Sequence, residues 1–295
     1  MYAGKTPLSW LRFPARRGRV TLTAMCLIAF DFRPSSTVPL RLVANRDEFH
    51  ARPTAALGAW EDAPEIIGGR DLAAGGGWLA MHENGRFAAV TNVRDPRLEA
   101  AADAPSRGAL VRTALECDDL SGWLASLAEG DAFRYAGFNL LAGDGQRLWH
   151  LHRGRDTLTL AAVAPGLHGL SNATLDTPWP KLLGARQGLA ASLRARWPED
   201  ALTAFADTRQ ASDDRLPDTG VELELERRLS APFIIGSDYG TRATTWLEWH
   251  SNGRFDIGER RFGPQGIALE KAGSLGHHES RPVSAASIQS FGGSR

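Results

Sequence analysis

A cysteine that directly follows a methionine is the feature of this sequence with the clearest chemical potential. Met25 and Cys26 open a short apolar run that ends at Phe32. If Cys26 were the first residue of the mature chain, it would carry both a thiol and a free α-amine. An α-amine with a pKa near roughly 8 can act as the base for its own thiol, as in N-terminal-nucleophile catalysis. The pattern therefore indicates a self-activated cysteine nucleophile, although it does not indicate a substrate.

Residues 1–24 bear directly on this chemistry, because they keep the amine of Cys26 in a peptide bond. The segment has no acidic residue and five basic ones, Lys5, Arg12, Arg16, Arg17 and Arg19. It is interpreted as a misassigned start ahead of Met25, a propeptide, or a targeting peptide. We favour a start at Met25, because this methionine immediately precedes the cysteine. The plain alternative is a basic tail in front of a buried structural cysteine.

Polar residues follow several predicted strands and could meet the thiol there. Asn45-Arg46-Asp47-Glu48 comes directly after the predicted strand 39–44. Such a run fits the rim of a pocket and a solvated turn with a local ion pair equally well. Asn92 and Asn172 each end an apolar run, which fits either donors to an oxyanion or caps for free backbone groups. For either asparagine alone, composition favours the cap.

Composition excludes several classes of protein. The chain has 34 basic and 34 acidic side chains, and 29 basic against 34 acidic remain without residues 1–24. This mildly acidic balance argues against a nucleic-acid partner. No apolar run is long enough for an integral membrane segment. Two cysteines make no disulfide framework, so we expect a reducing compartment and a cytoplasmic protein. His150 and His152 share a strand face without a third ligand, so we expect no metal site.

The predicted elements come in blocks of strands separated by blocks of helices. Strands are predicted at 25–32, 39–44, 78–82, 86–93, 137–142, 147–152, 157–163, 166–172, 233–235, 240–250 and 254–262. Helices are predicted at 107–116, 119–127, 180–197, 199–207 and 221–229. Asn-Gly turns at 84–85 and 252–253 favour antiparallel hairpins. The order predicts an α+β fold of antiparallel sheets covered by helices. Residues 272–295 are expected to be a disordered tail.

Several motifs in order resemble the NRDE family, also called the transport and Golgi organisation protein 2 family. They are Met25-Cys26, residues 45–48, 68–71, 77–79, 89–94, 137–140, 170–172, 175–181 and 241–245. The resemblance covers roughly residues 25–262. Departures are Gly77 where the family often has Thr, Ala243 where it often has Ser, and the segment before Met25. The resemblance implies that residues 25–271 form a four-layer αββα sandwich of two antiparallel sheets, of the N-terminal-nucleophile hydrolase type.

A more distant similarity, to the choloylglycine hydrolase group of amidases, implies catalytic roles. In that group an N-terminal cysteine attacks an amide, an arginine and an aspartate orient it, two asparagines lie near the thiol and oxyanion, and a late arginine completes the site. The matching positions are Cys26, Arg46, Asp47, Asn92, Asn172 and Arg242. The Arg46/Asp47 match is the loosest, because its spacing differs. The neighbouring Asn45, Glu48, Trp78 and Arg94 are expected to bind the substrate.

Two functions follow from these observations. The first is a cysteine N-terminal-nucleophile amidohydrolase that acts on a small amide without a cofactor. The second is a non-catalytic haem or lipid carrier on the same scaffold, since members of the family have been linked to haem handling and lipid homeostasis. In the carrier, Cys26, His82 or His168 would be the axial ligand, although no Cys-Pro or Cys-X-X-Cys-His motif is present. Either function implies a small-molecule partner, and the oligomeric state is not indicated.

Overall fold

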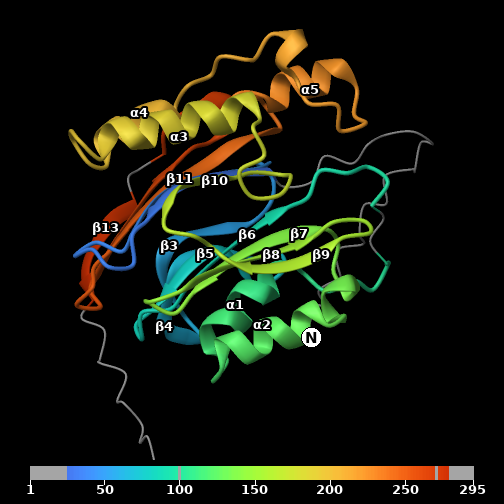
Figure 1. Cartoon of the computed structure of the whole chain (residues 1–295). Coiled ribbons are helices and arrows are strands. Elements are labelled where there is room, and N and C mark those ends of the chain that lie inside the picture. The colour runs from blue at the N-terminus through green and yellow to red at the C-terminus, as the bar shows by residue number, and fades with distance from the viewer. Residues whose placement is uncertain (1–24, 99–100, 270–271, 279–295) are drawn as a thin grey trace, which may run out of the picture.

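Two antiparallel sheets lie face to face, and helices cover the outer face of each (Figure 1). The computed structural model describes residues 25–98, 101–269 and 272–278. The first sheet has the order β10 (Gly166–Leu170), β1 (Met25–Phe32), β2 (Leu40–Phe49), β11 (Tyr239–Trp249), β12 (Phe255–Arg261) and β13 (Ala272–His278). The second runs β3 (Thr54–Trp60), β4 (Ala63–Asp71), β5 (Gly77–His82), β6 (Phe87–Asn92), β7 (Phe138–Gly143), β8 (Leu148–Arg153) and β9 (Leu158–Ala162).

The helices form the two outer layers. The first sheet is covered by α3 (Pro180–Ser192), α4 (Glu199–Phe205) and α5 (Leu223–Leu229). The second is covered by α1 (Gly108–Glu116) and α2 (Leu120–Ala128). Short 3-10 turns lie at Asp131–Arg134, Asp213–Arg215 and Pro264–Gly266. The predicted four-layer αββα arrangement of two antiparallel sheets is therefore confirmed.

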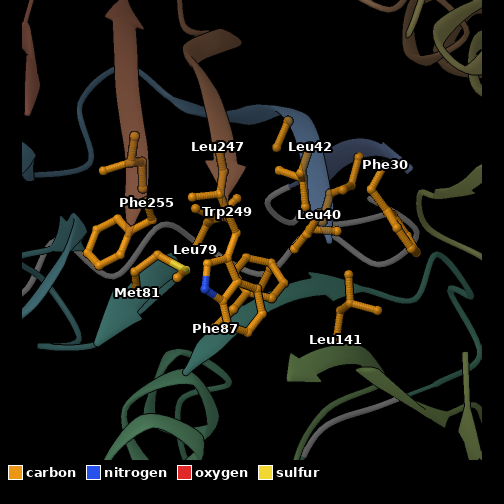
Figure 2. Packing of buried hydrophobic residues seen from close by; sticks show 14 of the residues in the cluster. Phe30, Leu40, Leu42, Leu79, Met81, Phe87, Leu141, Leu247, Trp249 and Phe255 are labelled. Atoms are coloured by element: carbon orange, nitrogen blue, oxygen red, sulfur yellow. The ribbon is translucent and has the colours of Figure 1, made fainter. Parts of the chain in front are cut away.

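The main hydrophobic core fills the space between the sheets (Figure 2). Phe30, Leu42 and Phe255 of the first sheet face Met81 and Phe87 of the second. Every one of these side chains is almost fully buried. Because strand side chains alternate between faces, one set of apolar residues fills this core and the other set meets the helices.

Side chains alternate between the two faces of β1, and this alternation determines the direction in which the Cys26 thiol points. Ile28 and Phe30 belong to the core between the sheets, whereas Leu27 and Ala29 pack against α3 and α4. Cys26 is in phase with Ile28 and Phe30, so its thiol also lies between the sheets, just beyond the apolar core. The start of β1 thus delivers the thiol to one end of the sandwich interior.

Three local predictions about strands are wrong. Strand β2 does not end at Ala44 but continues to Phe49, since it pairs with β1 on one side and with β11 on the other. Residues 233–235 are not in a strand, although Ile234 is hydrogen-bonded to Thr241. Residues 272–278 form β13, although we expect disorder from 272 onward. An edge strand needs only backbone partners, which composition does not reveal. Residues 1–24 and 279–295 lie outside the described residues.

Candidate functional site

The Asn45–Glu48 run lies within β2, so its four side chains alternate between the two faces of the sheet. All four are buried. Arg46 and Glu48 point between the sheets and line a cavity with Cys26. Asn45 and Asp47 point toward the helices. The run is therefore not a solvated turn. Two of its side chains line a pocket, as one interpretation of the sequence predicts, and the other two face the helices.

A cavity of about 500 Å³ adjoins the thiol. Among the residues that line it are Cys26, Arg46, Glu48, Trp78 and Asn92, all of which the sequence singles out. Three guanidinium groups and two carboxylates also face it, from Arg46, Arg52, Arg107, Glu48 and Asp71. A lining this rich in charge suits a small polar molecule better than an apolar one.

The charges of the cavity are arranged around Arg46. Its guanidinium lies 3.7 Å from Glu48 and 3.6 Å from Asp71, and it stacks 4.6 Å from the centre of the Trp78 ring. Arg52 makes the shorter ion pair with Asp71, at 2.6 Å. These contacts fix Arg46 beside the thiol, where its positive charge favours the thiolate.

The floor of the cavity depends on a close approach between Trp78 and a glycine. A Cβ atom on Gly69 would lie only 2.0 Å from the Trp78 ring. Glycine at this position therefore lets the Trp78 ring approach the backbone of β4 closely. Gly69 thus packs against the tryptophan, whereas its neighbour Gly68 packs against Ala80 of β5.

Asp47 lies on the opposite side of β2, behind the thiol. Its Oδ1 accepts a hydrogen bond of 2.6 Å from Thr241 Oγ1, which in turn accepts one of 2.9 Å from the Ile234 N–H. The hydroxyl proton is thus committed to the carboxylate. Asp47 Oδ2 is buried and has no hydrogen-bond partner among the described residues. Burial raises the pKa of Asp47 to about 6, although Lys181 opposes the rise.

The thiol is held in its neutral form while Met25 is attached. Cys26 is only 6% exposed. Burial and the negative charge of Asp47 raise the pKa of the Cys26 thiol to about 12, against the opposing effect of Arg46. Met25 packs among Leu229, Ile234 and other apolar residues on the helix side. In this form the cysteine is a poor nucleophile at neutral pH.

The two predicted asparagines are linked by a hydrogen bond from the side chain of Asn172 to the backbone of Asn92. Asn172 Nδ2 donates to the Asn92 carbonyl at 3.0 Å, and the Arg94 N–H donates to the Asn172 carbonyl at 2.7 Å. Ser171 Oγ lies 3.0 Å from the Cys26 carbonyl and also contacts Asn172. Asn92 lines the thiol cavity, whereas Asn172 holds the end of β6 that carries Asn92.

Three other predicted site residues lie away from the thiol cavity: Asn45, Arg94 and Arg242. Asn45 Nδ2 donates to the carbonyls of Phe205 and Pro232 at 2.8 Å each, and so ties β2 to the helix layer. Arg94 pairs with Glu226 at 3.2 Å.

Arg242 lies in a bulge of β11, between Thr241 and Ala243. Its Nη1 donates to the carbonyls of Phe49 and Arg52. It therefore holds the turn after β2 and does not face the cavity.

Sequence reasoning missed two buried polar residues near this site. Asn139 Oδ1 lies 3.0 Å from His150 Nε2 and 2.8 Å from His152 Nδ1, and its amide donates to the Ala173 carbonyl. This network supports the segment that carries Asn172. Lys181, on the first turn of α3, is buried behind the thiol. Its place in the family motif 175–181 is the one sequence signal that could have identified it.

Candidate ligands for a metal are dispersed over the described residues. No group of three or more histidine, cysteine, aspartate and glutamate side chains among them could hold an ion. His168 contacts Asp176 and the Ala164 carbonyl with its two ring nitrogens. His82 Nδ1 accepts from the Asn84 N–H on the face toward α1. Neither histidine lines the thiol cavity, so Cys26 is the only one of the three candidate axial ligands among its described lining residues.

None of the helices in the described part of the chain is both long and apolar enough to cross a bilayer.

Known proteins match this chain over most of its length. The family model "Transport and Golgi organisation 2" matches residues 25–264. The Bos taurus transport and Golgi organization protein 2 homolog is 36% identical over 260 residues, which cover 80% of this chain and 92% of that protein. The Homo sapiens homolog is 34% identical over 261 residues, with the same coverage. The Drosophila melanogaster protein is 26% identical over 262 residues, which cover 81% and 84%.

Two solved structures resemble the fold at low sequence identity. A Caenorhabditis elegans ortholog of N-acylethanolamine-hydrolyzing acid amidase has a TM-score of 0.37 and 9% identity, and the match covers 61% of this chain and 86% of that one. A mutant of the conjugated bile acid hydrolase from Clostridium perfringens has a TM-score of 0.45 and 8% identity, and the match covers 79% and 88%.

Proposed function

The chain belongs to the Transport and Golgi organisation 2 family, and from that premise we propose that it is a cysteine hydrolase of the N-terminal-nucleophile type. Its substrate is a small polar amide, and it acts once Cys26 is the first residue. One observation carries the proposal: the thiol faces a charged cavity, while the Met25–Cys26 peptide lies opposite Arg46 and Asp47 in the strand pair. The nucleophilic thiol and the α-amine that would act as its base thus belong to the same residue, Cys26.

Removal of Met25 would change the electrostatics of this residue. The freed amine would lie beside Asp47 Oδ2, which has no partner among the residues described. In its neutral form this amine can accept the thiol proton. The ammonium ion that it then becomes stabilises the thiolate, because a positive charge within about 4–6 Å of a thiol lowers the pKa of that thiol. The thiol that burial keeps protonated in the longer chain would therefore become ionisable near neutral pH.

The reaction follows from these groups. The neutral amine of Cys26 accepts the thiol proton, and the sulfur attacks the amide carbonyl to form an S–C bond. Asn92, which lines the cavity, would donate to the oxyanion that develops. The C–N bond then breaks as the ammonium returns its proton to the leaving nitrogen. Water hydrolyses the resulting thioester, which releases the acid and restores the thiol.

Alkylation of the thiol tests this proposal before any substrate is known. A chain that begins at Met25 keeps every element described above, and intact mass verifies that Met25 has been removed. We expect iodoacetamide at pH 7 to label Cys26 at least about tenfold faster in this form than in the 295-residue chain. Cys26→Ala identifies the labelled residue, and Cys117 serves as the internal comparison. A rate no higher than that of free cysteine overturns the proposal.

The alternative is a non-catalytic carrier of haem or lipid. Of the three candidate axial ligands, Cys26 lines the thiol cavity, and this is the observation on which the alternative rests. Titration with haem tests it: a spectral change that saturates at one equivalent and is lost in Cys26→Ala favours the carrier.

The hydrolase requires a reduced thiol, which is consistent with the cytoplasmic compartment that we propose.

A further inference from the structure

A buried lysine behind the thiol has no role in the mechanism described so far. Lys181 is 3% exposed, and its Nζ finds no hydrogen-bond acceptor among the residues that the structure describes. Burying an ammonium group without a partner is costly. A functional role would explain why the chain keeps a lysine in this position despite that cost.

The composition of the chain makes this lysine unusual. The sequence has 31 arginines but only three lysines, and Lys181 is the single lysine between residues 25 and 269. Arginine keeps its charge under all conditions, whereas a lysine readily loses its proton when it is buried. Burial and the charge of Arg94 lower the pKa of Lys181 to about 8.

The charges that face Lys181 come from every element around it. Asp47 on β2, Cys26 on β1 and Glu226 on α5 are the acidic groups that act on it, and Arg94 after β6 is the basic one. Tyr239 on β11 lies nearby and interacts with Asp47 and Cys26. Glu226 is already paired with Arg94 at 3.2 Å. Asp47 is thus the carboxylate left to balance Lys181.

We propose that Lys181 is a positioning residue that keeps the freed α-amine of Cys26 neutral, so that this amine can accept the thiol proton. The inference rests on the proposed function. With Met25 removed, two amino groups would compete for one carboxylate, that of Asp47. One of them must then give up its proton near neutral pH. The burial that lowers the pKa of Lys181 to about 8 would also act on the amine of the buried Cys26. The intrinsic order, about 7.7–8.0 for an α-amine against about 10.4 for a lysine, therefore makes the α-amine the group that loses its proton.

Without Lys181, the same site would work against catalysis. Asp47 alone would hold the α-amine as an ammonium ion, which cannot accept the proton of the thiol. A carboxylate within about 4–6 Å of an amine raises the pKa of that amine by about one to three units. Lys181 offsets that effect without touching the substrate, since it lies on the helix side of the sheet.

The pH dependence of alkylation tests the inference in the chain that begins at Cys26. We expect Lys181→Met to move the apparent pKa of the amine–thiol pair upward by about one unit, so that alkylation at pH 7 is about tenfold slower. Lys181→Arg keeps the charge and is expected to stay close to the parent profile. Arg186→Met, on the same helix but 30% exposed, is the matched control and should leave the profile unchanged.

Each outcome decides a different point. If the parent chain is unreactive, the proposed function and this inference fall together. If it is reactive and Lys181→Met has the same profile, only the inference is overturned. Because the charge of Lys181 also acts on the thiol directly, NMR titration of both chains labelled with carbon-13 cysteine reports the amine itself. Should Lys181→Met not fold, the parent chain alone is titrated. A pKa for that amine at or below about 8.0 in the parent chain supports the inference, and one above about 8.0 overturns it.

Discussion

Two arginine–carboxylate pairs lie on opposite sides of the first sheet, and they differ more in burial than in length. The Arg52–Asp71 pair at the thiol cavity is 2.6 Å long, with side chains 36% and 17% exposed. The Arg94–Glu226 pair on the helix side is longer, at 3.2 Å, but its side chains are only 3% and 4% exposed. Water screens the first pair and is excluded from the second, so the longer pair matters more to folding.

The side chains of the Asn45–Glu48 run of β2 are likewise divided between the cavity side and the helix side of the sheet. Its cavity side carries Arg46 and Glu48, which face the space for the substrate. Its helix side carries Asp47, whose carboxylate is buried and incompletely paired among the described residues. We therefore expect changes on the cavity side to alter the reactivity of the thiol and changes on the helix side to alter stability and proton affinity as well.

The largest predicted effect is the loss of Glu226. Glu226→Ala would leave the Arg94 guanidinium buried without its carboxylate and would also remove the acceptor for the Thr219 N–H. We expect the free energy of unfolding to fall by about 3–5 kcal/mol. Urea denaturation of the full chain measures this change.

A glutamate on the same helix provides the control for that experiment. Glu224 is 80% exposed and pairs with Arg227 at the surface. Glu224→Ala should change the free energy of unfolding by less than about 0.5 kcal/mol. Equal losses in the two variants would contradict the distinction between the buried and the exposed pair.

The layers were predictable from sequence because they depend on local patterns. Alternating apolar residues and the Asn84-Gly85 turn, where Gly85 has a φ of +86°, specify the β5–β6 hairpin. The strand character of Asn45–Glu48 was not predictable in this way, because four polar residues usually end a strand. They are accommodated only because β1 and β11 both pair with them.

The site was predictable in part. The residues that sequence analysis misplaced or missed owe their positions to tertiary contacts. Cys26 and Arg46 meet as expected, since neighbouring strands bring them into register. Arg242 has the expected place in the chain, but a bulge turns its side chain toward the carbonyls of Phe49 and Arg52. Lys181 looks like a surface residue of a first helical turn, and only the docking of α3 on the sheet buries it.

A smaller effect is predicted for the pH dependence of stability, through Asp47. Its pKa is about 6 in the folded chain and about 3.9 when unfolded, so the folded state binds the proton more tightly. Stability that this group contributes at low pH is therefore lost as the pH rises from about 4 to about 6. We expect the stability of the parent relative to Asp47→Asn to fall by up to about 3 kcal/mol over this range.

Urea titrations of both chains at several pH values measure that difference. Asp95→Asn is a useful contrast, because Arg97 lowers the pKa of Asp95 and the sign of its contribution is reversed. Parallel stability curves for the parent and Asp47→Asn would show that the carboxylate behind the thiol is not held in an unfavourable environment.

The smallest effect is predicted for the shorter ion pair. In Arg52→Ala, Asp71 would keep Arg46 at 3.6 Å and would gain contact with water from the cavity. We expect a loss of only about 0.2–1 kcal/mol in the free energy of unfolding, despite the 2.6 Å separation of the original pair. A loss as large as that of Glu226→Ala, measured in the same urea titration, would mean that the cavity excludes water as fully as the helix side does. The cavity would then strengthen every charge beside Cys26, and the division between the two sides of β2 would fail.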